Sequence, residues 1–292
     1  MSGVERRDME FVSGGDRVAG WHYPALGEAS GTWVVMAHGF SLTRHDGLAS
    51  FAEAFAAAGA DVLVFDHRFL GDSGGEPRQR VRLGEQREDW RNAVDHVRGH
   101  GARRVVLWGF SMSGGHAVQT ALADPSIDAV LALAPFLDGL RRAMTGRPGT
   151  TARIVALAMR ALTGSTVTIP VTAEPGQLAA MALPGEAEGF AAVVPPGSPW
   201  RNEVSPALFA SIVAHRPYRQ AGGLTCPVWF GIGGKDISVH GRAIEEAARR
   251  APASSLARYA EHDHWTPFLG EAPVAIAAEQ VAFLRAARLL RS

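Results

Sequence analysis

The chain has no long apolar run, no excess of either charge and only one cysteine. Among its 292 residues, 29 Lys and Arg balance 29 Asp and Glu, so no long-range field would draw it to nucleic acid or an anionic membrane. No uninterrupted apolar stretch approaches the roughly 18 residues of a transmembrane helix. The first residues, MSGVERRDMEF, lack the apolar core of a signal peptide. We therefore expect a cytoplasmic protein with neither nucleic-acid nor membrane partners.

Several classes of binding site are also missing from the sequence. Cys226 has no second cysteine for an internal disulfide, and its place in LTCPVWF predicts a packing role. The stretches GIGGKD and GDSGG lack the spacing of phosphate or dinucleotide loops, so no cofactor is predicted. His262 and His264 flank an aspartate, but no matching ligand cluster occurs elsewhere, so no metal site is predicted. Internal repeats and low-complexity segments are absent too.

What the chain does contain is an alternation of short apolar runs with longer helical patterns. TWVVMAHG precedes FAEAFAAAGA, DVLVFDHR precedes LGEQREDWRNAVDHVRGH, and RVVLWGF precedes SGGHAVQTALAD. The same alternation returns in CPVWFGIGG and GRAIEEAARRAP. This order is typical of parallel strands joined by crossover helices, and predicts an α/β fold with helices on both faces of a mostly parallel sheet. The first thirty residues predict an antiparallel hairpin at its edge.

The alternation stops between residues 136 and 223. This interval contains one strongly apolar helical pattern, TARIVALAMRAL, and a Pro/Gly-rich passage that ends in VVPPGSPW. Long excursions of this kind are often functional, and this one follows a strand whose carboxyl end would lie at the active edge of the sheet. We expect residues 1–135 and 224–292 to form the core, with 136–223 as an inserted helical lid. The alternative is a packed excursion that only stabilises the fold.

One serine is placed where a sharp turn would expose it. In VVLWGFSMSGGHAVQTAL, Ser111 lies between an apolar strand and a helical pattern. Gly109 and Ser113 are small enough to allow a tight turn, so the Ser111 side chain would stand clear of the backbone. The helix that follows directs its amino-terminal amides and dipole toward negative charge formed nearby. These features favour an activated nucleophile at Ser111.

The stretch GFSMSGG resembles the nucleophile elbow of the α/β-hydrolase superfamily, in the setting of strand, turn and helix that the motif requires. It departs from G-x-S-x-G at one position, where Ser113 replaces glycine. Ser113 is the alternative nucleophile, but it would lack a glycine two residues earlier and would lie within the helix. The resemblance covers nearly the whole chain from Trp33 onward, and residues 136–223 are its least familiar part.

The superfamily places an acid and then a histidine after the nucleophile, each on a loop at the same edge of the sheet. By this resemblance Asp236, after VWFGIGG, is the acid and His264, in HDHWTPF, is the base. Asp138, after an earlier strand, and His262 are the alternatives. The other histidines, including His67, are expected to be surface or structural residues.

The resemblance also implies two backbone donors for the oxyanion that forms during acyl transfer. One is the amide of Met112, directly after the nucleophile. The other is the amide of Phe40 in MAHGF, where the turn after the first parallel strand resembles the oxyanion loop of the superfamily. Because any residue has a backbone amide, the residue type does not identify these donors, and they are predicted only from their positions in the sequence.

The combination of HGF, DHR, WGFSMSGGH and HWTPF resembles bacterial hydrolases related to dienelactone hydrolases and small acyl esterases. The expected reaction is hydrolysis of an ester, thioester or lactone of a small acyl substrate through an acyl-enzyme. An acyltransferase, lyase or cyclisation enzyme on the same site, or a non-catalytic binding protein, is the alternative. The apolar residues of the predicted 151–162 helix would line an acyl pocket or belong to the core: Ile154, Val155, Leu157, Met159 and Leu162.

Overall fold

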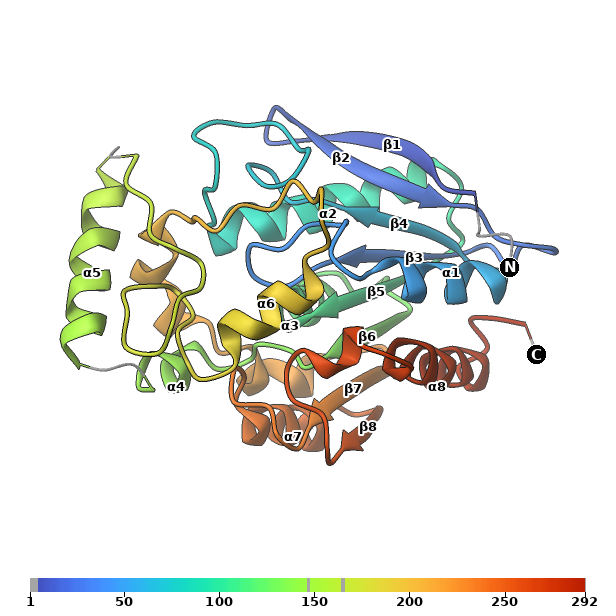
Figure 1. Cartoon of the computed structure of the whole chain (residues 1–292). Helices are drawn as coiled ribbons and strands as arrows, with labels where there is room; N and C mark the ends of the chain where they lie inside the picture. Colours follow the sequence, from blue (N-terminus) through green and yellow to red (C-terminus); the bar gives the residue numbers. More distant parts are fainter. Residues whose placement is uncertain (1–4, 146–147, 164–165, 292) are drawn as a thin grey trace.

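An eight-stranded sheet passes through the middle of the computed structural model, which describes residues 5–145, 148–163 and 166–291 (Figure 1). The strands are β1 (Arg7–Ser13), β2 (Asp16–Tyr23), β3 (Thr32–Ala37), β4 (Asp61–Phe65), β5 (Arg104–Phe110), β6 (Ala129–Leu133), β7 (Val228–Gly233) and β8 (Ser254–Tyr259). Their spatial order is β1-β2-β4-β3-β5-β6-β7-β8. From β4 to β8 all neighbours are parallel, as the sequence predicts.

The amino-terminal hairpin forms the antiparallel edge of the sheet. β1 pairs with β2, and β2 continues antiparallel onto β4, with Tyr23 opposite Val62. This confirms the hairpin predicted for the first thirty residues. The central strands β3 and β6 are buried along their whole length because helices cover both faces, which explains why β6 is apolar throughout and β3 is apolar after Thr32.

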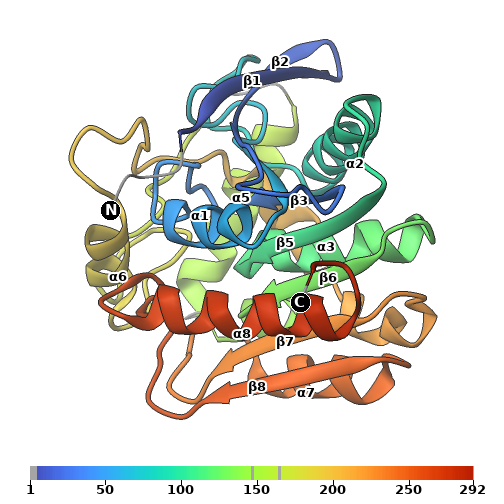
Figure 2. The ribbon, with the colours of Figure 1, turned by 90° about the vertical axis from the view of Figure 1, so that its right-hand side faces the viewer.

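Two layers of helices enclose the sheet (Figure 2). One face carries α1 (Ala49–Ala57) and α8 (Ala272–Ala286), and the other carries α2 (Leu83–Gly99), α3 (Ser111–Ala123) and α7 (Gly241–Arg250). Because β3, β5, β7 and β8 are parallel, the loops that follow them gather at one edge of the sheet. Every predicted site residue lies on one of these loops or at the start of α3.

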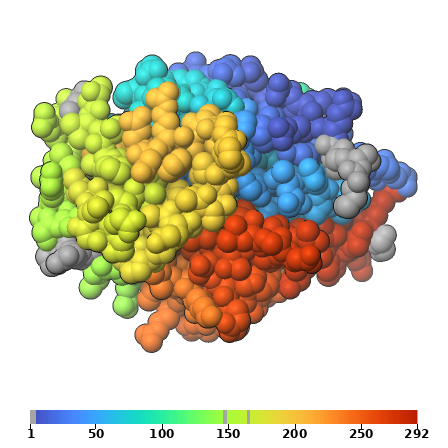
Figure 3. Space-filling view, in the orientation of Figure 1, coloured from blue at the N-terminus to red at the C-terminus, as the bar shows by residue number. Residues whose placement is uncertain are grey.

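Residues 136–223, named here the 136–223 segment, cover that edge (Figure 1). Its elements are the helices α4 (Gly139–Ala143), α5 (Pro148–Leu162) and α6 (Glu186–Val193) and the 3-10 turns η1 (Pro206–Ala210), η2 (Ile212–Ala214) and η3 (Pro217–Gly223). The turn η4 (Thr266–Phe268) lies outside this segment, before α8. In the space-filling view the green to yellow residues make up the end of the molecule away from both termini (Figure 3). The proposed division into core and lid stays a prediction.

None of the helices that the structure describes combines the length and the apolar character needed to cross a membrane.

Candidate active site

Ser111 lies at the sharp turn between β5 and α3. Its φ is +52°, a left-handed conformation that residues other than glycine rarely adopt. A Cβ on Gly109 would lie 2.3 Å from the backbone oxygen of Ser113, so only glycine lets the strand and the helix approach this closely. The tight turn leaves the Ser111 side chain at the wall of a small cavity.

His264 lies in the loop after β8 and contacts both predicted partners. Its Nε2 is 3.1 Å from the Oγ of Ser111, and its Nδ1 is 2.7 Å from the Oδ2 of Asp236. In a neutral ring whose Nδ1–H donates to the carboxylate, Nε2 is left to accept the hydroxyl proton of Ser111. Both His264 and Asp236 are almost fully buried, which limits competition from water for these hydrogen bonds.

Backbone donors fix the carboxylate of Asp236. Its Oδ1 accepts the amide N–H groups of Ser238 at 2.9 Å and Val239 at 3.1 Å, so Oδ2 remains directed at His264. The hydroxyl of Ser238 donates to Glu186 on α6 at 2.8 Å. The loop that carries the predicted acid is therefore bound to the 136–223 segment. Sequence reasoning missed Glu186, because no local pattern marks a carboxylate whose partners are distant along the chain.

The alternative acid and base have other partners. Asp138 caps α4 by accepting the amide of Arg141, and its carboxylate lies 3.3 Å from the Nε of Arg216. The ring of His262 stacks on Tyr259 at 4.9 Å between centroids. Neither forms a hydrogen bond with Ser111 among the residues that the structure describes. Ser111, His264 and Asp236 are brought together, while their catalytic roles stay a prediction.

Ser113 takes part in a second chain of Ser, His and Asp that the sequence analysis did not find. Its Oγ lies 3.2 Å from the Nε2 of His67, whose Nδ1 lies 3.2 Å from the Oδ2 of Asp89 on α2. Asp89 also accepts from the hydroxyl of Ser13 on β1 and from the guanidinium of Arg68. Ser113 is 1% exposed, so this hydrogen-bonded series lies in the interior and joins the start of α3 to α2. The structural role expected for His67 agrees with these contacts.

Phe40 and Met112 line the same small cavity as Ser111, which is where oxyanion donors are needed. The turn before Phe40 is held by His38, whose Nε2 donates to the carbonyl of Asp46 at 2.6 Å while Nδ1 accepts the amide N–H of Gly39 at 2.7 Å. Burial lowers the pKa of His38 to about 3, so the ring is neutral and makes both contacts at neutral pH.

The turn around Phe40 is also bound to the 136–223 segment. Asp46 accepts both the amide and the hydroxyl of Thr43 through Oδ2, and accepts the hydroxyl of Ser198 at 2.7 Å through Oδ1. Burial raises the pKa of Asp46, and these donors oppose that shift. Together with the bond between Ser238 and Glu186, this contact attaches the 136–223 segment to two loops of the candidate site.

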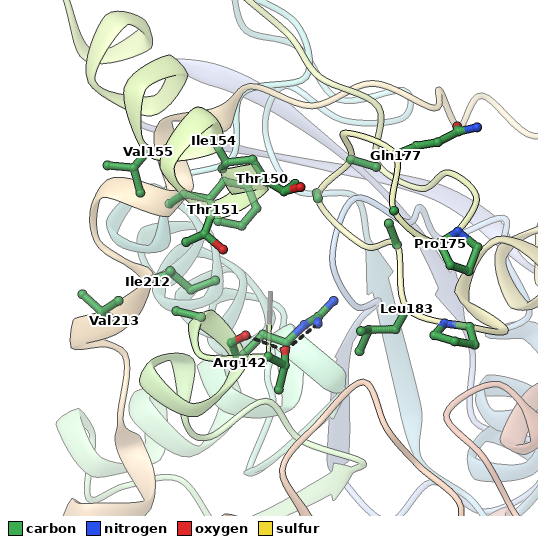
Figure 4. Close-up of a pocket in the computed structure, with 18 residues that line it drawn as sticks. Arg142, Thr150, Thr151, Ile154, Val155, Pro175, Gln177, Leu183, Ile212 and Val213 are labelled. Atoms are coloured by element: carbon green, nitrogen blue, oxygen red, sulfur yellow. Dashed lines mark hydrogen bonds between the residues drawn. The ribbon is translucent and has the colours of Figure 1, made fainter. Parts of the chain in front are cut away.

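Two cavities that share lining residues lie at this edge of the sheet, and Ser111 lines the smaller one. The first, named here the reaction pocket, is about 40 Å³ and is lined by Ser111, Phe40, Met112 and residues of the 136–223 segment. The second, named here the chamber, is about 530 Å³ and lies between α5, residues 175–184 and the η1–η2 turns (Figure 4). Only the second falls in the range of roughly 300–1,000 Å³ that is usual for ligand sites.

The pocket expected along α5 is found for only part of that helix. Ile154 and Val155 line the chamber, and Leu157 packs against the core. Met159 and Leu162 are 57% and 44% exposed, so the expectation that they line a pocket or belong to the core is wrong. The helix is apolar on several faces, so its sequence does not say which face turns inward.

Within the described ranges, no group of three or more His, Cys, Asp or Glu side chains is arranged to hold a metal ion. Asp263, between the two histidines, instead accepts the amides of Trp265 and Thr266 at 2.9 and 2.8 Å and closes its own turn.

Comparisons with known proteins agree with this architecture. The family model for the alpha/beta hydrolase fold matches residues 32–271. Among solved structures, the α/β hydrolase GrgF from Penicillium superposes with a TM-score of 0.83 at 24% identity, covering 97% of this chain and 98% of that one. A complex of DcsB with its substrate analogue gives a TM-score of 0.82 at 22% identity, covering 97% and 99%. These two likenesses concern the fold.

Curated relatives extend the likeness to the sequence. The quorum-quenching protein AidA of Acinetobacter baumannii is 33% identical over 286 residues, 95% of this chain and 94% of that protein. The thiohydrolase aneE of Aspergillus aculeatus is 38% identical over 40% of this chain and 38% of its own length. The polyketide transferase grgF of Penicillium is 30% identical over 54% and 53%. From the matched family model, the strand order and the full-length similarity to AidA, we conclude that this chain belongs to the α/β-hydrolase family.

Proposed function

We propose that the protein is a serine hydrolase that cleaves an ester, thioester or lactone of a small acyl compound. The observation that carries this proposal is the hydrogen-bonded series from Ser111 Oγ to His264 and Asp236, with Ser111 held at a φ of +52° beside a cavity. A serine hydroxyl is a weak nucleophile until an aligned base takes its proton, and this geometry supplies such a base.

In the proposed mechanism, Ser111 Oγ attacks the acyl carbon while its proton passes to the Nε2 of His264. The carboxylate of Asp236 stabilises the imidazolium through Nδ1–H. The amides of Phe40 and Met112 stabilise the tetrahedral oxyanion. The bond to the alcohol or thiol leaving group then breaks as His264 returns the proton to that group. A water molecule, deprotonated by His264, hydrolyses the acyl-enzyme and restores Ser111.

The names of the relatives support acyl chemistry and leave two reactions open. Thiohydrolases are consistent with attack on a thioester, and polyketide transferases are consistent with delivery of the acyl group to an acceptor other than water. Acyl transfer is therefore the second candidate, and it uses the same acyl-enzyme. Product analysis with competing alcohols and amines separates the two, because a transferase forms the acylated acceptor in preference to the free acid.

The 136–223 segment is proposed to act as a lid, since it contributes to the walls of both cavities and is bound to both loops of the site. The cytoplasmic location expected from the sequence stays a prediction.

The test is reaction of the purified protein with a fluorophosphonate, followed by peptide mass mapping. Labelling at Ser111 that disappears in Ser111→Ala and persists in Ser113→Ala is the expected result. The Ser111→Ala variant should also lose on the order of 10³-fold or more in turnover of an ester or thioester while it stays folded. A folded Ser111→Ala variant with undiminished turnover would contradict the mechanism.

A further inference from the structure

The reaction pocket and the chamber adjoin at a few shared side chains. Arg142, Ala180, Phe209 and Ile212 line both cavities. A group bound in the chamber and joined to an acyl carbon at Ser111 must therefore pass these four residues. Given the proposed function, the chamber is the natural place for the chain of the acyl group.

Arg142 is the charged residue in this passage. Every other described residue that lines either cavity is uncharged. Figure 4 shows Arg142 at one end of the chamber, with Ile212 to one side and Leu183 to the other. Its side chain is only 18% exposed and lines both cavities, whose other lining residues are mostly apolar, so it is largely withdrawn from bulk water.

Glu186 holds the guanidinium in place and neutralises it. Nη2 of Arg142 donates to both carboxylate oxygens at 3.1 and 3.2 Å, and Nη1 donates to the hydroxyl of Thr145 at 3.1 Å. Glu186 is 1% exposed and also accepts from Ser238 and from the amide of Leu183, both at 2.8 Å. A guanidinium has five N–H donors, so at least two remain after these three contacts with described residues.

The chemistry of the passage follows from these contacts. A plain alkyl chain beside Arg142 displaces water from the spare donors and offers no acceptor, which is unfavourable in an apolar cavity. A keto or hydroxyl oxygen on the chain accepts a hydrogen bond there. A carboxylate would instead bring a second negative charge next to Glu186, whose own charge already balances Arg142. The fitting substituent is therefore a neutral oxygen.

We propose that Arg142, oriented by Glu186, selects acyl groups that carry a neutral oxygen substituent on one of the first few carbons beyond the carbonyl. The position follows from the small reaction pocket, about 40 Å³, which Ser111 and Arg142 share. This inference rests on the proposed function, since it assigns the substrate class of that same site.

The test compares thioesters of N-acetylcysteamine that have the same main-chain length: octanoyl, 3-oxooctanoyl, 3-hydroxyoctanoyl, 5-oxooctanoyl and 5-carboxyoctanoyl, so that the carboxylate is on the same carbon as one of the neutral oxygens. Thiol release gives kcat/KM for each, and the intrinsic reactivity of each thioester is removed by dividing by its rate of hydroxide hydrolysis. At least one of the neutral oxygenated chains should exceed octanoyl by about ten-fold, with the carboxylate the poorest substrate.

Variants assign the preference to Arg142. In the doubly neutral variant Arg142→Gln with Glu186→Gln, the advantage of the best oxygenated chain over octanoyl should fall about ten-fold. Arg142→Lys keeps a positive charge opposite Glu186 but has fewer donors. Its ratio of kcat/KM for the best oxygenated chain to kcat/KM for octanoyl should therefore lie between the ratios of wild type and the double variant. This variant replaces the double variant in the test if the double variant does not fold. The matched control is Arg141→Gln, an exposed neighbour on α4 that lines neither cavity, which should keep the wild-type ratio.

The outcomes separate this inference from the proposed function. If fluorophosphonate labels Ser111 but the preference for the oxygenated chain over octanoyl is the same in wild type, Arg142→Lys and the double variant, Arg142 does not select the acyl group, and the hydrolase proposal stands. If wild type prefers octanoyl, or the carboxylate chain, the assignment of a neutral oxygen is also wrong. If folded protein shows neither labelling of Ser111 nor turnover, the proposed function is wrong, and so is the role proposed for Arg142.

Discussion

Asp236→Asn should disable the base while leaving the shape of the site unchanged. The carboxylate now receives two backbone amides through Oδ1 and the Nδ1–H of His264 through Oδ2. An asparagine keeps most of these bonds by directing its carbonyl oxygen at the two amides, which leaves its NH2 group facing Nδ1. The opposite rotamer would direct the NH2 group at two N–H donors, which is less favourable.

With an NH2 group 2.7 Å from Nδ1, the His264 ring must present Nδ1 as an acceptor and carry its proton on Nε2. Nε2–H then donates to Ser111 Oγ and cannot take the hydroxyl proton. The expected fall in kcat is on the order of 10⁴-fold, or about 5.5 kcal/mol in the activation free energy. The loss in the free energy of unfolding should be much smaller, about 1–3 kcal/mol, because only one charged hydrogen bond is removed.

The assay is turnover of a short acyl thioester, with single-turnover acylation measured in parallel to isolate the first step. The matched control is Asp263→Asn, because Asp263 accepts the amides of Trp265 and Thr266 through one oxygen, which asparagine also offers. Asp138→Asn tests the alternative acid. The reasoning is refuted if folded Asp236→Asn retains turnover within about ten-fold of wild type, or if Asp138→Asn shows the larger loss.

Three further predictions concern stability. Burial lowers the pKa of His38 from 6.5 to about 3 and that of His215 from 6.5 to about 4, so below pH 6.5 the unfolded chain binds more protons than the folded protein. As the pH falls from about 6.5 to 4, each histidine should therefore lower the free energy of unfolding by up to about 1.4 kcal/mol per pH unit. Ser113→Gly leaves a buried histidine nitrogen without its partner, so it should lower the free energy of unfolding by about 1–3 kcal/mol in urea titrations. Gly189→Ala puts a Cβ 2.0 Å from the buried ring of Trp265, the neighbour of His264, so it should lower the free energy of unfolding by about 1–3 kcal/mol and also reduce kcat. In its control, Gly84→Ala, the new Cβ has no atom within 4 Å, so this variant should not be destabilised.

Each of these has a clear contrary result. A urea midpoint that is constant from pH 7 to pH 4.5 would contradict the buried neutral histidines. A Ser113→Gly variant as stable as wild type would mean that its hydrogen bond contributes nothing. Equal stability of the Gly189→Ala and Gly84→Ala variants would show that α6 can move away from the Trp265 ring at no cost.

The location of the candidate site could be predicted from sequence because it depends on strand order. An apolar strand followed by a small-residue turn and a helix fixes where Ser111 lies. Parallel strands bring the later loops to the same edge, and the resemblance to the α/β-hydrolase superfamily then implied Asp236 after β7 and His264 after β8. The alternation of strands and helices predicted the edge of the sheet, and the resemblance predicted which residues on that edge are the acid and the base.

The walls of the cavities could not be predicted in this way. Arg142 and Glu186 are 44 residues apart, and Asp46 and Ser198 are 152 apart, and in both pairs one or both residues lie in the irregular 136–223 segment. Periodicity indicates a face of a helix but says nothing about which distant loop covers it. The exposed position of Met159 has the same cause, because α5 has apolar residues on its outer side as well as its inner side.

The two Ser-His-Asp series of this protein differ in accessibility rather than in composition. Ser113 lies as close to a histidine, 3.2 Å, as Ser111 does at 3.1 Å, and each histidine also contacts an aspartate. Ser113, however, lines neither cavity, and its backbone belongs to an ordinary helical turn, whereas Ser111 has a φ of +52° and lines the reaction pocket. Of these two serines, Ser111 is therefore the one that we expect an acyl carbon to reach. Labelling of Ser113 by a fluorophosphonate in folded protein would contradict this expectation, because it would show that Ser113 is also accessible.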